Sequence, residues 1–298
     1  MTYSIVARDP ATGELGIGVQ TCFFAVGSVV PWARPGVGVV ATQAIAERAY
    51  GPRCLDALAS GAAAGEALAR ARAADPGAAL RQVAVVGADG TAAVETGEMC
   101  LDHAGHVAGD GWSAQANMVA SPDVWGAMAA AYEATSGPLA RRLLAALEGG
   151  DAAGGDARGR MSAALLVVAG EAPDDPGGGL RLDLRVDRSE DPLGDLARLL
   201  DASDAYATFD GAANQLFAGD PAAALGTIDG ALGMLPGEEN MRMIRAGALL
   251  ASGAVDDGVA EVRALVAARP TWEVIFRSFA DRGLLPLPAG LAVDDLFA

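Results

Sequence analysis

The chain has 298 residues, of which 52% are hydrophobic and only 5% aromatic, so a sizeable core rich in small aliphatic side chains is expected. The formal net charge of -17 argues against nucleic acid and anionic membrane surfaces as partners, because clustered cations are needed to bind phosphate groups. The sequence contains no lysine, which excludes a Ser–Lys dyad, a Schiff base and a phosphate-binding lysine.

The sequence predicts neither a membrane span nor a signal peptide. The longest uncharged stretch, residues 15–33, is interrupted by glycines, polar residues and Pro31. No basic segment precedes an apolar one near the N-terminus. Three widely spaced cysteines do not predict a disulfide framework. We therefore expect a cytoplasmic protein without a membrane partner.

Apolar runs separated by Gly and Pro turns predict strands in most of the first two hundred residues. Residues 9–13, Asp-Pro-Ala-Thr-Gly, predict a turn between the first two strands, and residues 88–90, Ala-Asp-Gly, predict a second hairpin. Strands are expected over residues 3–8, 15–20, 37–41, 82–86, 92–95, 112–119, 161–168 and 180–186, with helices over 52–59, 63–74 and 138–147 and from residue 121 onward. This segregated order is typical of an α+β fold with mainly antiparallel sheets.

The remainder of the chain is helical in pattern and contains a repeat. Leu216, Gly219, Leu225, Ile228, Leu232 and Pro236 recur 34 residues later as Leu250, Gly253, Val259, Val262, Val266 and Pro270. A period of 34 residues is that of tetratricopeptide repeats, which consist of two helices per unit. We expect a small all-α tetratricopeptide-like module with repeats at about residues 204–236 and 238–270, followed by a capping helix over 271–281 and a tail.

Thr2 is the simplest nucleophile that the sequence offers. Bacterial initiator methionine is generally removed when the next residue is small, and removal here would leave Thr2 at the amino terminus. The α-amine of a terminal threonine, with a pKa of about 7.7–8.0, can accept the proton of its own hydroxyl while Oγ attacks a carbonyl. No separate base from distant sequence is then required.

Cys100, His103 and His106 form a second group of chemically capable side chains, and these are the only two histidines of the chain. Three readings remain open for this group: a turn that carries polar residues, a metal site, or a Cys–His pair. The Cys-x2-His-x2-His spacing is not one of the usual structural zinc patterns, and a second cysteine pair is missing.

A glycine-rich segment over residues 149–160 contains Asp156 and Arg158 and lies between a predicted helix and a predicted strand. Glycine allows a backbone to approach a ligand closely, and the arginine fork suits a carboxylate. Arg34 and Arg53 occur in two further rigid loops that contain Pro and aromatic residues. These arginines are candidates for a pocket near the terminus.

Several blocks of the chain resemble, in the same order, the domain-of-unknown-function family 1028. The blocks are TYSIVARDPATGELG at 2–16, AVGSVVPWAR at 25–34, GVVATQ at 38–43, YGPR at 50–53, RQVAVV at 81–86 and GGDARG at 154–159. The resemblance covers roughly residues 2–196. The family is placed with the N-terminal-nucleophile (Ntn) hydrolases on fold grounds, so the resemblance implies a four-layer αββα Ntn-hydrolase-like sandwich over residues 1–196. The helical pattern and the repeat predict the helical module over residues 197–298.

The resemblance also implies an amide-bond hydrolase that acts on a small-molecule or peptide-like substrate. Thr2 would be the nucleophile, and Asn117 with backbone N–H groups would hold the oxyanion. The candidate substrate-binding residues are Arg34, Arg53, Asp156, Arg158, Gln115 and His106. We expect no cofactor and no metal in this reaction, and a homodimer, because Ntn-type sheets often assemble.

The alternative is a non-catalytic binding or scaffold protein. In that case the first domain would be a scaffold, and the helical repeats would bind a peptide, a partner protein or a cell-wall fragment. The tail over residues 269–286 is similar to a peptidoglycan-binding segment found behind such domains. A retained Met1 favours this alternative, because it would leave Thr2 without a free α-amine.

Overall fold

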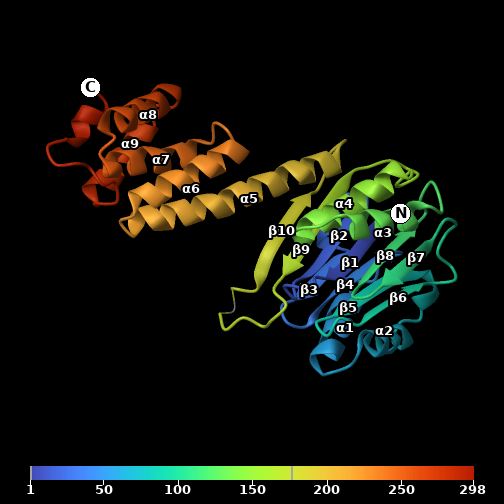
Figure 1. Ribbon diagram of the computed structural model, residues 1–298. Helices are drawn as coiled ribbons and strands as arrows, with labels where there is room; N and C mark the ends of the chain where they lie inside the picture. The colour runs from blue at the N-terminus through green and yellow to red at the C-terminus, as the bar shows by residue number, and fades with distance from the viewer. Residues whose placement is uncertain (1, 176) are drawn as a thin grey trace. The chain divides into compact units, whose positions relative to one another are not determined.

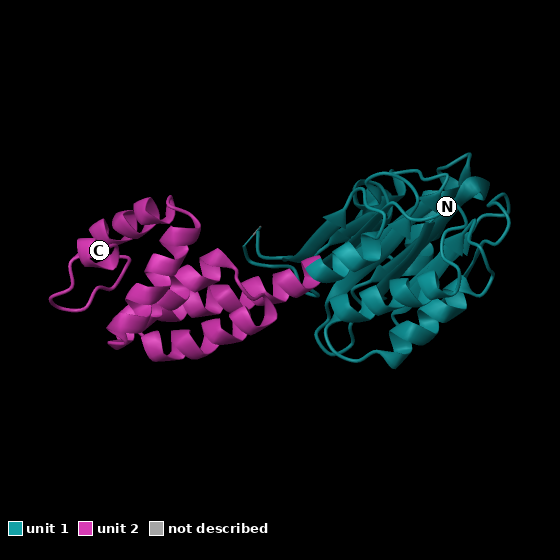
Figure 2. Ribbon diagram, turned by 90° about the horizontal axis from the view of Figure 1, so that it is seen from above, with its two compact units in different colours: residues 1–198 teal, residues 199–298 magenta. Residues whose placement is uncertain are grey.

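The computed structural model describes residues 2–175 and 177–298, which fall into two compact units (Figures 1 and 2). The first unit ends at Arg198, and the second comprises Leu199–Ala298. The boundary lies within helix α5 (Pro192–Phe217), which begins before the first predicted repeat at about residue 204. Within the described residues, no helix is long and apolar enough to cross a membrane.

The first unit contains two antiparallel sheets, as expected for an α+β protein. The six-stranded sheet has the order β10-β9-β2-β1-β8-β7, and the four-stranded sheet has the order β3-β4-β5-β6. The strands are β1 (Thr2–Arg8), β2 (Leu15–Thr21), β3 (Pro31–Arg34), β4 (Gly38–Ala44), β5 (Arg81–Gly87), β6 (Ala92–Thr96), β7 (Gly105–Gly109), β8 (Trp112–Asn117), β9 (Ser162–Val168) and β10 (Leu180–Val186). Strands β3 and β7 were not predicted from the sequence.

Helices cover the outer face of each sheet (Figure 1). Helices α3 (Val124–Ala134) and α4 (Leu139–Ala152) pack on the six-stranded sheet, chiefly on β1, β2 and β8. Helices α1 (Tyr50–Ala59) and α2 (Ala64–Ala73) pack on β4 and β5 of the other sheet. The two sheets face each other, so the layers of the first unit run helix, sheet, sheet, helix.

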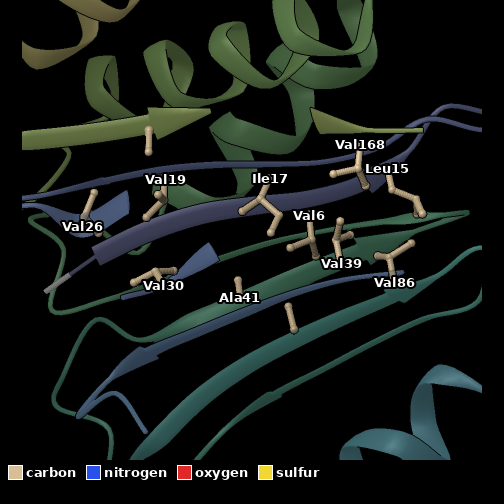
Figure 3. Close-up of a cluster of buried hydrophobic side chains, with 12 residues drawn as sticks. Val6, Leu15, Ile17, Val19, Val26, Val30, Val39, Ala41, Val86 and Val168 are labelled. Carbon is tan, nitrogen blue, oxygen red and sulfur yellow. The ribbon is translucent and has the colours of Figure 1, made fainter. Parts of the chain in front are cut away.

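The space between the sheets is apolar at one end and polar at the other. Figure 3 shows the apolar end, where Val6 and Ile17 of the six-stranded sheet meet Val39 and Val86 of the four-stranded sheet. Side chains alternate between faces along a strand, so Thr2 shares the inner face of β1 with Val6. Polar residues therefore replace apolar ones between the sheets toward the start of β1.

Asp75 ties helix α2 to strand β5 and helix α1. Its carboxylate accepts hydrogen bonds from Arg81 Nε at 2.9 Å, Tyr50 Oη at 3.1 Å and the Gly77 amide at 2.8 Å. The Asp75 side chain is only 8% exposed. The bond from Arg81, helped by the other two donors, lowers the pKa of Asp75 below its ordinary value.

We expect Asp75→Asn to lower the free energy of unfolding by about 2 kcal/mol at pH 7, since hydrogen bonds to a buried charge are lost. Because the pKa of Asp75 is lowered by folding, its contribution is present above the unfolded pKa of about 3.9 and is lost as pH falls through the folded value. The gap between variant and wild type, measured by urea unfolding, should thus shrink below pH 4. Asp56→Asn is the control, because its ion pair with Arg34 is exposed and is worth about 0–1 kcal/mol. A gap that is constant with pH would contradict the assignment.

The second unit is helical. Its helices after α5 are α6 (Pro221–Met234), α7 (Glu239–Ser252), α8 (Val255–Ala268) and α9 (Trp272–Asp281). The bounds of α6 and α8 are 34 residues apart, which matches the offset of the sequence repeat. Trp272 and Phe276 of α9 join a buried cluster with Val262 and Leu265 of α8. Helix α9 thus covers apolar side chains that α8 would otherwise expose.

Candidate active site

Thr2 begins β1 at the polar end of the space between the sheets. It lies opposite Asn117 in the pairing of β1 with β8, and its neighbour Tyr3 lies opposite Gln20 of β2. The Thr2 side chain is buried, and its Oγ1 donates a hydrogen bond to Oγ1 of Thr21 at 3.2 Å. A hydroxyl nucleophile at this position is therefore held between two sheets rather than on the outer surface.

Beside Thr2, a network of buried polar side chains crosses from one sheet to the other. Ser4, Gln43, Gln82, Gln115 and Asn117 all have an exposed fraction of 0–1%. The strand pairing places them in register, because Ser4 lies opposite Gln115 in one sheet and Gln43 lies opposite Gln82 in the other. Buried polar groups of this kind are stable only when they are hydrogen-bonded to one another.

Gln82 sets the orientation of this network. Its Nε2 lies 2.9 Å from the carbonyl oxygen of Ala116 and 3.1 Å from that of Gly105, and these oxygens can only accept hydrogen bonds. Its Oε1 therefore faces the other way and accepts from Gln43 Nε2 at 2.7 Å and from Asn117 Nδ2 at 3.0 Å. The two backbone carbonyls thus fix the orientation of the Gln82 amide, and through it the orientations of the Gln43 and Asn117 amides.

Gln43 carries this orientation to β1. Because its nitrogen faces Gln82, its Oε1 accepts from Ser4 Oγ at 2.7 Å. Ser4 Oγ accepts in turn from Gln115 Nε2 at 2.7 Å, and Gln115 Oε1 accepts from Ser113 Oγ at 2.7 Å. Every group along this path has one orientation that is consistent with its neighbours. The network of buried polar side chains beside Thr2 is therefore rigid.

Asn117, which lies opposite Thr2, has a side-chain oxygen without a hydrogen-bond donor among the described residues. Its Nδ2 donates to the Thr2 carbonyl oxygen at 3.3 Å and to Gln82 at 3.0 Å, whereas its buried Oδ1 has no hydrogen-bond partner among the described residues. An oxyanion needs donors, and both Asn117 donor hydrogens are engaged in this arrangement. The spare atom of Asn117 is suited to receive an N–H group.

A pocket of about 200 Å³ adjoins Thr2. Thr2, Thr21 and Gln43 supply its polar lining. Its other walls are apolar and come mainly from Phe23, Phe24, Val26, Val29, Val30 and Ala44. The site therefore combines a hydroxyl, a fixed amide and a small apolar cavity.

Backbone strain is concentrated at the rim of this site. Among the described residues, four non-glycine residues have a positive φ, and three of them are Ala25 (54°), Ala44 (70°) and Met118 (53°). Ala44 lines the pocket, Ala25 lies between two lining residues, and Met118 follows Asn117. A left-handed conformation is costly for residues other than glycine, and its clustering is typical of functional sites.

Asp156 and Arg158 lie at the edge of the pocket rather than in its lining. The buried Asp156 carboxylate accepts hydrogen bonds from the Cys22 amide at 3.0 Å and the Arg158 amide at 2.9 Å. The Arg158 guanidinium lies over the ring of Phe23, 5.0 Å from its centre. Both residues therefore contact the segment that follows Thr21.

Gln115 and Asn117 are brought close to Thr2, but three other predicted residues are not. Arg34 lies opposite Gly38 at the other end of β4 and forms an ion pair with Asp56 at 2.8 Å. Arg53 is exposed on α1, and it does not line the pocket. His106 is exposed on β7, where its Nδ1 lies 2.8 Å from Thr96 Oγ1.

The cysteine and histidine group is dispersed among separate partners. Cys100 Sγ donates to the Arg81 carbonyl at 3.5 Å, and His103 Nδ1 lies 3.0 Å from the Val119 carbonyl. Burial raises the pKa of the Cys100 thiol, which opposes a reactive thiolate. Within the part of the chain that the structure describes, no three His, Cys, Asp or Glu side chains are grouped to hold a metal ion.

A larger hollow of about 680 Å³ lies in the helical unit, between the start of α7 and α9. Glu239 and Arg269 line it and form an ion pair at 2.9 Å, and Trp272 Nε1 donates to Glu239 at 2.7 Å. The exposed side chains of Val274 and Ile275 complete it. Glu239 and Arg269 are thus engaged with each other.

Comparison with known proteins places the chain in a family. Residues 2–196 match the model described as "Family of unknown function (DUF1028)", and the chain belongs to this family. A solved structure of the same family, protein SPO2555 from Silicibacter pomeroyi, is 35% identical in sequence. It superposes with a TM-score of 0.61 over 67% of this chain and 84% of that chain. The search of curated proteins finds no match.

Proposed function

We propose that the first unit is an amide hydrolase of the N-terminal-nucleophile type, with Thr2 as its nucleophile after removal of the residue that precedes it. One observation carries the proposal: Thr2, at the start of β1, places its hydroxyl between the sheets beside a pocket. The helix–sheet–sheet–helix order of layers supports an αββα Ntn-like fold. The membership of the family, by itself, supplies no reaction.

In this mechanism Thr2 Oγ attacks the carbonyl carbon of an amide, and the hydroxyl proton passes to the α-amine of Thr2. The proton is then given to the departing amine as the C–N bond breaks, which leaves an ester on Oγ. Water attacks the ester, the carboxylic acid is released and the Thr2 hydroxyl is restored. When the Thr2 proton turns toward the α-amine, the Thr21 hydroxyl becomes the donor in the contact between the two Oγ1 atoms and keeps Thr2 Oγ1 at the pocket. The free Oδ1 of Asn117 receives an N–H of the α-amine.

The intact mass of untagged protein from a bacterial host tests the first requirement of the proposal. We expect a mass that lacks one methionine, because the residue after Met1 is small. A protein that retains Met1 would overturn the proposal, since Thr2 would then have no free amine. The hollow of the helical unit, with the tetratricopeptide-like binding role expected from the sequence, would become the better candidate site.

A further inference from the structure

The pocket beside Thr2 carries an inference about the substrate. We propose that it binds the uncharged, apolar acyl group of the amide that Thr2 attacks, an inference that rests on the proposed function. A volume of about 200 Å³ is smaller than the roughly 300–1,000 Å³ of pockets that hold a whole drug-sized ligand. The pocket therefore holds one substituent of the substrate, and the rest of the molecule lies outside.

The chemistry of the walls selects an apolar substituent. Among the described residues, no acidic or basic side chain lines the pocket, and its polar groups are confined to Thr2, Thr21 and Gln43. The Gln43 amide is engaged, because its oxygen accepts from Ser4 and its nitrogen donates to Gln82. A carboxylate in the pocket would lose its hydration without a cationic side chain in the lining to pair with. It would also favour the protonated form of the Thr2 α-amine, which cannot act as the base. The acidic substrate group expected from the arginines is thus disfavoured at this position.

The acyl side of the substrate fits the pocket better than the amine side. The acyl group stays attached to Thr2 Oγ through both halves of the reaction, so its binding site must adjoin the nucleophile. The amine has to leave after the first half, and it needs an open path. Phe23 and Phe24 line the pocket yet are 62% and 66% exposed, which places them at its mouth, where an outgoing group passes.

Two chain segments with a residue of positive φ contribute to the walls of the pocket. Ala25 lies in the segment between Phe24 and Val26, and Ala44 ends β4. Both segments are anchored from outside the pocket, since Val26 N donates to Ser162 Oγ at 3.1 Å and Arg81 Nη1 donates to the Ile45 carbonyl at 2.6 Å. The walls are therefore preformed, which reduces the cost of ordering them around a ligand.

A series of acyl p-nitroanilides tests the inference with the full chain. For acetyl, propionyl, butyryl and isovaleryl anilides, we expect kcat/KM to rise about fourfold for each added methylene, equivalent to about 0.8 kcal/mol. The succinyl anilide should react more slowly than the butyryl anilide.

Ala46→Phe tests whether this pocket is responsible for the series. It places a ring in the pocket from an exposed position, so kcat/KM should no longer rise with acyl length. Ala59→Phe, at an exposed position of α1 outside the lining, should leave the series unchanged.

Binding to the Thr2→Ala chain separates this inference from the proposed function. Saturation-transfer NMR should detect the isovaleryl anilide bound to Thr2→Ala, and the signal should vanish when Ala46→Phe is added. If this binding is observed but wild type hydrolyses none of the anilides, the hydrolase proposal is wrong and the pocket assignment stands. Hydrolysis at equal rates for butyryl and succinyl anilides, or an unchanged series in Ala46→Phe, would overturn the pocket assignment and keep the hydrolase. The absence of both binding and hydrolysis would overturn both.

Discussion

Thr2→Ala is expected to lower kcat/KM for amide hydrolysis by at least about 10²–10⁴-fold, while the protein stays folded. The alanine variant keeps the α-amine and the strand pairing of β1 but lacks the only atom that attacks the substrate. Thr2→Ser keeps both the hydroxyl and a small residue after Met1, so it should retain activity within about tenfold. The measurement is the initial rate with the isovaleryl anilide, alongside thermal unfolding of each variant.

The α-amine adds a pH signature to this prediction. Because the neutral amine is the base, kcat/KM should rise with pH and level off above the pKa of a terminal amine, about 7.7–8.0. Thr21→Val serves as the matched control, since it removes the hydrogen-bond acceptor of Thr2 Oγ1 but no reacting atom. A loss of about fivefold, or about 1 kcal/mol, is expected there. Full activity of Thr2→Ala would exclude Thr2 as the nucleophile.

Thr2 stands out in the sequence as a candidate nucleophile because the proposed chemistry depends on its place in the chain, whereas its neighbours in the site do not stand out. Thr21, Gln43 and Gln82 lie at or next to the ends of three strands. Gln43 and Gln82 belong to blocks that resemble the family, but those blocks indicate no role for them. The local sign of such a residue is that it is polar at a position where the strand's alternation predicts an apolar side chain on the inner face. Thr21 follows Ile17 and Val19 of β2 in this way. The strand ends that meet in the site are brought together by strand pairing and by the packing of the two sheets. Both involve residues far apart in the chain, so local sequence patterns do not predict them.

Asp156 and Arg158 illustrate a different limit. Their glycine-rich setting indicated a ligand-binding loop, but part of it, Gly149 and Gly150, belongs to the last turn of α4. A Cβ at Gly149 would lie 2.7 Å from Ala131 Cβ, so this glycine allows α4 to pack against α3. The carboxylate of Asp156 accepts hydrogen bonds from two backbone amides and so also orders the loop itself. Residue type alone does not distinguish these uses.

The two unpredicted strands show why edge strands escape pattern analysis. β3 begins with Pro31, which lacks an amide hydrogen and is tolerated because β3 is at the edge of its sheet. β7 contains Gly105 and Gly109, which usually indicate a loop. A Cβ at Gly105 would lie 2.6 Å from the Trp125 ring, so the absence of a side chain makes room for that ring. The hairpin at residues 88–90, in contrast, joins β5 to β6 as predicted, since its turn is local.

Gln82 is where the structure predicts the largest loss of stability. In Gln82→Leu, Gln43 Nε2 and Asn117 Nδ2 lose their shared acceptor, although each keeps a longer bond to the Thr2 carbonyl at 3.3 Å. The carbonyl oxygens of Ala116 and Gly105 lose the bond from Gln82 Nε2. A hydrogen bond contributes about 0.5–1.5 kcal/mol net, so the loss of four should lower the free energy of unfolding by about 3 kcal/mol or more. Against a typical total of about 5–15 kcal/mol, this loss is easily measured by urea unfolding.

Gln20→Leu is the matched control for Gln82→Leu, because Gln20 is equally buried in a strand. Its Nε2 donates one bond, to the Thr21 carbonyl at 3.2 Å, and its Oε1 already lacks a partner among the described residues. Replacing it removes an unsatisfied oxygen at the expense of one bond, so its effect should stay within about 1 kcal/mol. If both variants lose the same stability, burial alone explains the loss. A large loss confined to Gln82→Leu would show that the amide network holds the two sheets together at the end where Thr2 lies.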